Sequence, residues 1–215
     1  MELNVYLFDS LAGILKTTSD RGIVFTYDSK YLDGKNIPLS ISLPLREKEF
    51  TQKECIPYFV GLLPEGTVKQ RIAQDLHVSE LSTVKLLEAL GGECAGTVSF
   101  YSSENQNIKI KENNWVLNDK NYKEITDQEI FEMIQNISER PLLYSSKELR
   151  LSLAGAQEKI SLAFFNNKWH LPINGAPSTH ILKPTRARTL STIAANEFIC
   201  MQLANNMKMQ VPQTQ

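Results

Sequence analysis

A turn of small residues, a strand lysine and a helix glutamate are the parts of this sequence most suited to chemistry. The turn is Ala154-Gly155-Ala156, which lies between two β-type runs. Because it carries no large side chains, its backbone N–H groups could come close to an anion. Further along, Lys183 ends an apolar β-type run, and Glu197 is the one acid of the helix-type run that follows. This order favours a site for a phosphorylated ligand.

The same order of parts occurs in the N-lobe of protein kinases. There the loop covers the phosphates of ATP, the strand lysine offsets their charge, and the helix glutamate orients the lysine. Each part also has an ordinary structural interpretation when it is taken alone. A small-residue turn closes many hairpins, a strand lysine is often a solvated edge residue, and a helix glutamate usually faces solvent.

The elements that would position these residues form two regions. In the first, β-type runs over 4–8, 14–15 and 23–27 predict a β-meander, and the alternating run 40–45 predicts an edge strand ended by Pro44. Apolar spacing predicts helices over 54–63, 67–76 and 82–90, followed by a strand over 97–101.

The second region begins after a polar stretch. A helix over 126–137 follows the N-cap residue Thr126. Strands are expected over 149–153, 160–165, 169–172 and 179–183, with a two-residue turn at Asn166-Asn167, and a helix over 192–206. The predicted fold class is α+β, a small β-meander and helix subdomain followed by a partial kinase-like N-lobe. The predicted domains are 1–102, a linker and helix at 103–145, and 146–215.

Composition is that of an ordinary soluble globular protein. The 215 residues are 42% hydrophobic and 22% charged, with a formal net charge of −1 at pH 7. The charge gives no bias toward nucleic acid or anionic membranes. No apolar run approaches the length of a membrane span, and the start lacks the basic and apolar regions of a signal peptide. The three widely spaced cysteines predict neither a zinc site nor disulfides, so a cytoplasmic location is expected.

Several segments together resemble the HipA family of serine/threonine kinase toxins. Ser152 to Lys159 is similar to the family's phosphate loop, 179–183 to its ATP-lysine strand, and 196–200 to the following helix. Upstream, 42–45, 62–66 with Arg71, and 91–96 resemble its N-terminal subdomain. The likeness covers essentially the whole chain and keeps the family's order.

The resemblance implies roles for particular residues. The residues implied to contact ATP are Ala154, Gly155, Ala156, Gln157, Glu158, Lys159 and Lys183. Ser152 would be the loop serine that the family autophosphorylates to inactivate itself, because a phosphate adds charge of about −1.5 to −2 to a loop that must hold a polyanion. Glu197 is the candidate for orienting Lys183. The alternative for Ser152 is an ordinary strand hydroxyl.

The sequence departs from the family in the residues of phosphoryl transfer. A kinase needs a catalytic Asp, an Asn and a further Asp for Mg²⁺, but no Asp follows Asp127 here. We therefore name no catalytic and no metal-binding residue, leave open whether the chain is an enzyme, and expect weak or no binding of ATP with Mg²⁺. The ending resembles a truncation, and Leu182, Ile199 and Leu203 are expected to expose apolar surface that promotes self-association.

The resemblance implies a toxin of a type II toxin–antitoxin system that causes persistence by phosphorylating a translation protein, such as glutamyl-tRNA synthetase. The implied partner is a HipB-type helix-turn-helix antitoxin, which would link the toxin to operator DNA. The alternative is a non-catalytic module that binds an antitoxin or a separately encoded kinase core.

Overall fold

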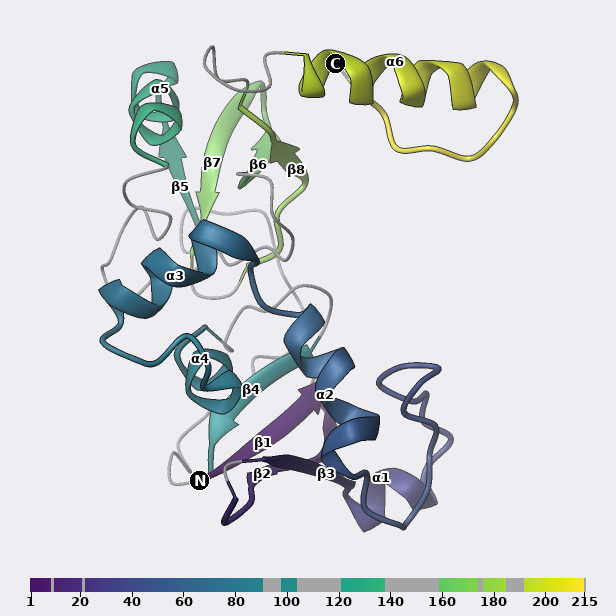
Figure 1. Ribbon diagram of the computed structural model, residues 1–215. Helices are drawn as coiled ribbons and strands as arrows, with labels where there is room; N and C mark the ends of the chain where they lie inside the picture. Colours follow the sequence, from purple (N-terminus) through teal and green to yellow (C-terminus); the bar gives the residue numbers. More distant parts are fainter. Residues whose placement is uncertain are drawn as a thin grey trace.

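The computed structural model describes residues 1–8, 10–20, 22–90, 98–103, 121–137, 159–173, 176–184 and 192–214. These residues form two four-stranded antiparallel sheets with separate hydrophobic cores. Figure 1 shows the sheets at opposite ends of the molecule, each with its helices. We call the described residues up to 103 the first unit and those from 121 onward the second unit. The predicted α+β fold, a meander subdomain followed by an antiparallel sheet with a helix, is confirmed.

The first sheet is the expected meander with one strand added from later in the chain. Its strands are β1 (Glu2–Leu7), β2 (Ser10–Thr17), β3 (Ile23–Tyr27) and β4 (Val98–Ser102), in the order β3-β2-β1-β4. Side chains alternate across a strand, and in β1 the residues Leu3, Val5 and Leu7 are buried. One face of the sheet therefore builds the core of the first unit.

Helices cover that face. They are α1 (Ser29–Asp33), α2 (Gln52–Gly61), α3 (Gly66–Asp75) and α4 (Thr83–Leu90). Helix α2 contacts β3, and α4 contacts β4 and β2. Phe59 of α2 joins the layers, because its ring centroid lies 5.5 Å from that of Phe25 and 5.9 Å from that of Phe100. Such edge and tilted aromatic contacts are favourable packing geometries.

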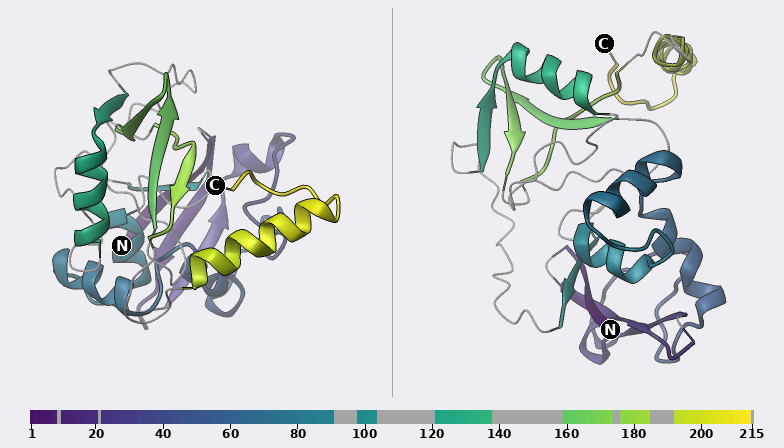
Figure 2. Two further views of the ribbon diagram at one scale, coloured as in Figure 1. Left: turned by 90° about the horizontal axis from the view of Figure 1, so that it is seen from above. Right: turned by 60° about the vertical axis from the view of Figure 1, so that its left-hand side comes forward.

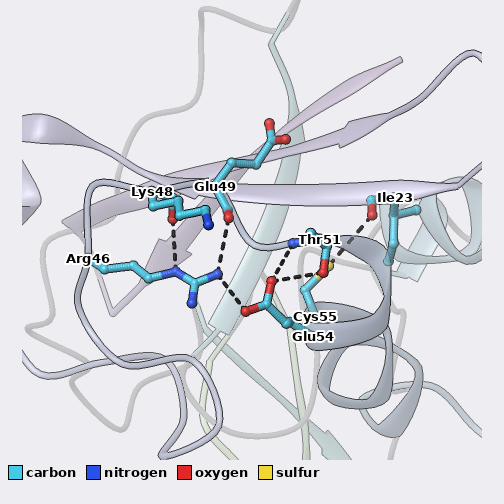
Figure 3. Close-up of polar contacts among 7 residues, drawn as sticks. All are labelled: Ile23, Arg46, Lys48, Glu49, Thr51, Glu54 and Cys55. Carbon is cyan, nitrogen blue, oxygen red and sulfur yellow. Dashed lines mark hydrogen bonds and ion pairs between the residues drawn. The ribbon is translucent and has the colours of Figure 1, made fainter.

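Arg46 holds the segment that leads into α2 (Figure 3). Its Nη2 donates to Glu54 Oε1 at 2.8 Å and to the Glu49 carbonyl at 3.1 Å. Its guanidinium carbon also lies 3.6 Å from the centroid of the Phe50 ring, a cation–π contact. Glu54 in turn accepts from the Thr51 backbone N–H at 2.8 Å, as part of a capping box. The start of α2 is thus fixed by polar contacts.

The edge strand predicted over 40–45 is wrong, since this segment contains only an isolated bridge between Ser40 and Leu43. Side chains supply hydrogen bonds in place of a strand ladder. The buried Tyr27 hydroxyl donates to the Leu43 carbonyl at 2.5 Å and accepts from the Leu39 N–H at 2.9 Å. Ser40 Oγ accepts from the Ser42 N–H at 3.2 Å. Local side-chain bonds of this kind compete with regular structure.

The second sheet contains β5 (Tyr122–Ile125), β6 (Ile160–Phe165), β7 (Lys168–Pro172) and β8 (His180–Leu182), in the order β5-β7-β6-β8. Helix α5 (Asp127–Asn136) covers one face, where Ile130 and Met133 pack with Leu162 and Leu171. This helix, which the sequence predicted within the segment 103–145, packs with the second core. Strand β5 was not predicted, and the strand expected over 149–153 lies outside the described residues.

Helix α6 (Ile193–Asn206) extends sideways from the second unit (Figures 1 and 2). None of its residues is buried. The chain after it turns back, with the Met209 N–H donating to the Ala204 carbonyl at 3.1 Å. Among the described helices, none is long and apolar enough to cross a lipid bilayer.

Candidate functional site

Two lysines meet at one end of the pairing between β6 and β8. The strands are antiparallel, with Ser161 opposite Ile181 and Ile160 opposite Leu182. One further step in this register places Lys159 opposite Lys183, where side chains directly across from each other are close neighbours. The charge of Lys183 does act on Lys159. The hairpin geometry therefore brings together two of the residues singled out in the sequence.

Lys183 is paired with the helix glutamate. Its Nζ donates a hydrogen bond to Glu197 Oε1, and both side chains are partly buried, with 31% and 39% of their surface exposed. Glu197 lies in the second turn of α6, so the contact joins this helix to the end of β8. A charge-assisted hydrogen bond of this kind fixes the direction of the lysine side chain.

The environment of Lys159 disfavours its charged form. Burial is the main cause that lowers the pKa of this ammonium group, and the positive charge of Lys183 lowers it further. Two carboxylates, Glu197 and Glu65, act in the opposite direction. Lys159 is thus a partly desolvated cation beside another cation. An anionic ligand would relieve the repulsion between the two.

The other predicted site residues fall in a segment about which the structure says nothing. Ser152 and the loop residues Ala154, Gly155, Ala156, Gln157 and Glu158 lie outside the described residues. The loop connects directly to Lys159 in the sequence, so the lysine pair stands at the point where the loop joins β6. The described part of the candidate site therefore consists of the pair Lys159 and Lys183 and of Glu197.

Sequence reasoning gave no role to Glu65, although it noted the segment 62–66. Glu65 precedes α3 in the first unit, and its negative charge slightly raises the pKa of Lys159 in the second unit. No pattern in the sequence points to this effect, because it depends on how the two units face each other. For a metal, the described residues offer no group of three or more His, Cys, Asp or Glu side chains.

Comparison with known families gives two matches in sequence order. Residues 3–101 match a model described as the HipA N-terminal domain. Residues 151–215 match a model described as the HipA-like C-terminal domain. The second match includes the loop, the lysine pair and Glu197.

Individual proteins agree with these matches. Y4mE of Sinorhizobium fredii, a kinase by its name, is 37% identical over 94% of this chain and 47% of its own length. The serine/threonine-protein kinase toxin HipA of Shewanella oneidensis is 28% identical over 98% of this chain and 46% of its own length. This chain therefore spans about half the length of these two relatives.

A solved structure shows the same fold. It is the S. oneidensis toxin–antitoxin complex of HipA, HipB and operator DNA, with a TM-score of 0.72 and 25% identity. The match covers 99% of this chain and 47% of the chain in that complex. Together, the two domain models, the kinase relatives and the shared fold show that this chain belongs to the HipA family of serine/threonine kinase toxins.

Proposed function

We propose that this chain is the part of a HipA-type kinase toxin that holds the phosphates of ATP. The observation that supports this most directly is the ion pair between Lys183 and Glu197 beside Lys159. A strand lysine held by a helix glutamate is how kinases keep a cation aimed at the α- and β-phosphates. In this proposal, residues 1–102 form the N-terminal subdomain, and residues 146–215 begin the kinase N-lobe. Strand β5 and helix α5, which come from the segment between them, are also part of this N-lobe.

The site residues are better suited to contacting the phosphate groups of ATP than to binding the Mg²⁺ ion that accompanies it. Lys183 would contact the phosphates from β8, and Lys159 would contact them from the start of β6. Residues 154–158 would cover them, and Ser152 would be the regulatory phosphorylation site. For Mg²⁺, the described part of the chain contains no suitable cluster of ligands. No step of the reaction is therefore assigned to a metal held by these residues.

We propose further that this chain alone does not transfer phosphate. The family's activity is ATP-dependent phosphorylation of Ser or Thr, which requires an Asp near the attacking hydroxyl. No Asp follows Asp127 in this sequence. Incubating the purified chain with labelled ATP should give neither ATP turnover nor autophosphorylation. Incorporation of label at Ser152 would contradict this.

The wider function follows from the family. We propose a cytoplasmic toxin of a type II toxin–antitoxin system whose complete form phosphorylates a translation protein such as glutamyl-tRNA synthetase. The related S. oneidensis toxin is found in a complex with HipB and operator DNA. A HipB-like helix-turn-helix antitoxin is accordingly the partner that we propose, with operator DNA contacted through that antitoxin.

ATP binding can be tested by NMR titration of the isotope-labelled chain. We expect weak binding with shift changes centred on Lys159 and Lys183, and we expect Lys183→Met to abolish them. The matched control is Lys168→Met, because Lys168 lies in the same sheet and forms an exposed ion pair with Glu124. Equal binding by both variants, or no shift changes in the original chain, would contradict the proposal.

A second function is favoured by one comparison. An uncharacterized protein of Haemophilus influenzae is 32% identical over 94 residues, which cover 85% of its length and 44% of this chain. That length is close to the region 3–101 matched by the HipA N-terminal domain. A unit of this size can thus be a separate protein. As the alternative, we propose a non-catalytic module that binds an antitoxin or a separately encoded kinase core.

The DNA directly downstream distinguishes the two candidates. An in-frame or frameshifted stretch encoding a catalytic Asp and Asn would support the kinase proposal. A separate short gene for a kinase core would support the binding module.

A further inference from the structure

Strand β8, which leads directly into Lys183, has few residues of its own to fix its position. It is three residues long and lies at the edge of the second sheet, where β6 is its one neighbour among the described strands (Figure 1). His180 and Ile181 are exposed, and Leu182 is partly buried. Register is weakly specified in a strand that buries so little surface, and a slip by one residue turns every side chain to the opposite face. Such a slip would direct Lys183 away from Glu197.

Thr179, the residue just before β8, fixes the start of this strand on β6. Its hydroxyl oxygen accepts a hydrogen bond from the Phe164 N–H at 2.8 Å, and its own N–H donates to the Leu162 carbonyl at 2.9 Å. Both partners belong to β6, so the two bonds determine where the beginning of β8 meets that strand. Because the bond to Phe164 uses a side chain in place of a backbone carbonyl, it depends on which residue stands at position 179.

His180 adds contacts on the other side of the strand. Its Nδ1 lies 2.7 Å from Thr179 Oγ1, a hydrogen bond in which either atom can donate. Its ring centroid lies 5.9 Å from that of Phe164 and 5.3 Å from that of Trp169, both in the edge-to-face arrangement that aromatic rings favour. Side chains alternate along a strand, so His180 and Lys183 point to opposite faces. The strand is therefore held on one face and presents its lysine on the other.

We propose that Thr179 is a positioning residue, whose hydroxyl sets the register of β8 on β6 and so places Lys183 opposite Lys159 and within reach of Glu197. The inference rests on the proposed role of Lys183 in binding the phosphates of ATP. Glu197 fixes the end of the lysine side chain, whereas Thr179 fixes the strand from which that side chain starts. The apparent affinity for ATP is proportional to the fraction of molecules in which β8 has this register. A short edge strand has little stability to spare, so the loss of a hydrogen bond should lower that fraction.

The first experiment compares ATP binding to the full chain, to Thr179→Val and to Thr179→Ser. Valine has nearly the shape of threonine and suits a strand, but it has no hydroxyl to bind the Phe164 N–H. We expect it to weaken ATP binding about five- to ten-fold, the change that the loss of one or two hydrogen bonds produces in an equilibrium. Serine keeps the hydroxyl and should restore the affinity to within about two-fold of the original.

Thr126→Val is the matched control. Thr126 is also an exposed threonine of the second unit, and its hydroxyl accepts from a backbone N–H, that of Glu129 at 3.2 Å, but it precedes α5 and not β8. This variant should lower the stability to urea without changing the affinity for ATP. Unchanged ATP binding by Thr179→Val, an equal loss in Thr126→Val, or a serine variant no better than the valine variant would overturn the inference.

The second experiment observes the strand register without ATP. Ser161 and Ile181 face each other across β6 and β8, so NMR should detect a cross-strand contact between their backbones. This contact, and that between the side chains of Lys183 and Glu197, should weaken in Thr179→Val and persist in Thr179→Ser. Unchanged contacts in the valine variant would contradict a positioning role for the hydroxyl.

Lys183→Met separates this inference from the proposed function. If the contacts weaken in Thr179→Val but Lys183→Met leaves ATP binding intact, the proposed function fails while the role of Thr179 in the register stands. If Lys183→Met abolishes binding and Thr179→Val changes neither the contacts nor the affinity, only the inference fails.

Discussion

At the scale of single residues, two glutamates act through the hydrogen bonds they accept at the starts of helices. Glu54 accepts from the backbone and hydroxyl of Thr51 and from Arg46. Glu129 has the same relation to Thr126 at the start of α5. Both helices thus begin with a capping box, in which a charged glutamate binds an otherwise unpaired N–H. The charge state of these two glutamates therefore affects the stability of the first turn of each helix.

Glu54 gives a prediction about acid stability. Hydrogen bonds from Thr51 and Arg46 lower the pKa of Glu54 to about 2, from an ordinary value near 4.5. A lowered folded-state pKa stabilises the protein above the ordinary value, and this contribution is lost as the pH falls from about 4.5 toward 2. Thermal unfolding between pH 7 and pH 2 should show this loss in the original chain.

In Glu54→Gln that part of the pH dependence should be absent, and stability at pH 7 should be lower. Glu88→Gln is the control, since Glu88 is an exposed residue in the middle of α4. If the original chain and Glu54→Gln lose the same stability between pH 4.5 and pH 2, the capping carboxylate does not titrate as described.

At the scale of elements, the turn between β6 and β7 restricts which residues can occupy it. Asn166 and Asn167 have φ angles of 52° and 59°. Two consecutive residues in this left-handed region match the twist of a two-residue hairpin. Asparagine tolerates the conformation, whereas a β-branched residue does not. This hairpin carries Lys159 at the far end of β6, so its register affects the site.

We expect Asn167→Val to destabilise the chain by about 1–2 kcal/mol, the usual cost of a left-handed residue with a constrained side chain. Asn167→Gly should be close to neutral, because glycine adopts positive φ without strain. Urea unfolding of both variants measures the difference. A valine variant as stable as the glycine variant would mean that the turn can change its conformation without penalty.

The elements also show how far sequence reasoning reaches. Helices α2 to α5 and strand β6 follow regular apolar spacing and were predicted closely. Strand β5 was missed because its two buried residues, Tyr122 and Ile125, belong to different cores, so no alternating pattern exists. The segment 40–45 does alternate, but the hydroxyl of Tyr27 organises it instead of a neighbouring strand.

For the candidate site, sequence order was enough to pair Lys183 with Glu197, since both belong to one arrangement known from kinases. It was not enough to find Glu65, whose effect on Lys159 depends on the packing of two units that are distant in sequence. Contacts within a unit follow local patterns, but an electrostatic effect between units has no local signature in the sequence. The roles of Ser152 and residues 154–158 remain predictions.

At the scale of the whole molecule, α6 and the residues just after it gather several exposed apolar side chains among the described residues. The side chains of α6 and those just after it include large apolar residues with 40% to 67% of their surface exposed: Phe198, Ile199, Leu203, Met207 and Met209. Leu182, which the sequence analysis grouped with Ile199 and Leu203, instead packs partly against the second core. Adjacent exposed apolar side chains on one helix favour association, because contact removes their surface from water.

We therefore expect the purified chain to self-associate through α6. Size-exclusion chromatography with light scattering should show a mass above that of the monomer, increasing with protein concentration. Replacing Ile199 and Leu203 by Gln should shift the chain toward the monomer, because it removes the two most exposed of the large apolar side chains within the helix itself. The control is Phe131→Gln, since Phe131 is similarly exposed, at 55%, but lies on α5. A monomer at every concentration, or an equal effect of the control, would show that α6 is not the contact surface.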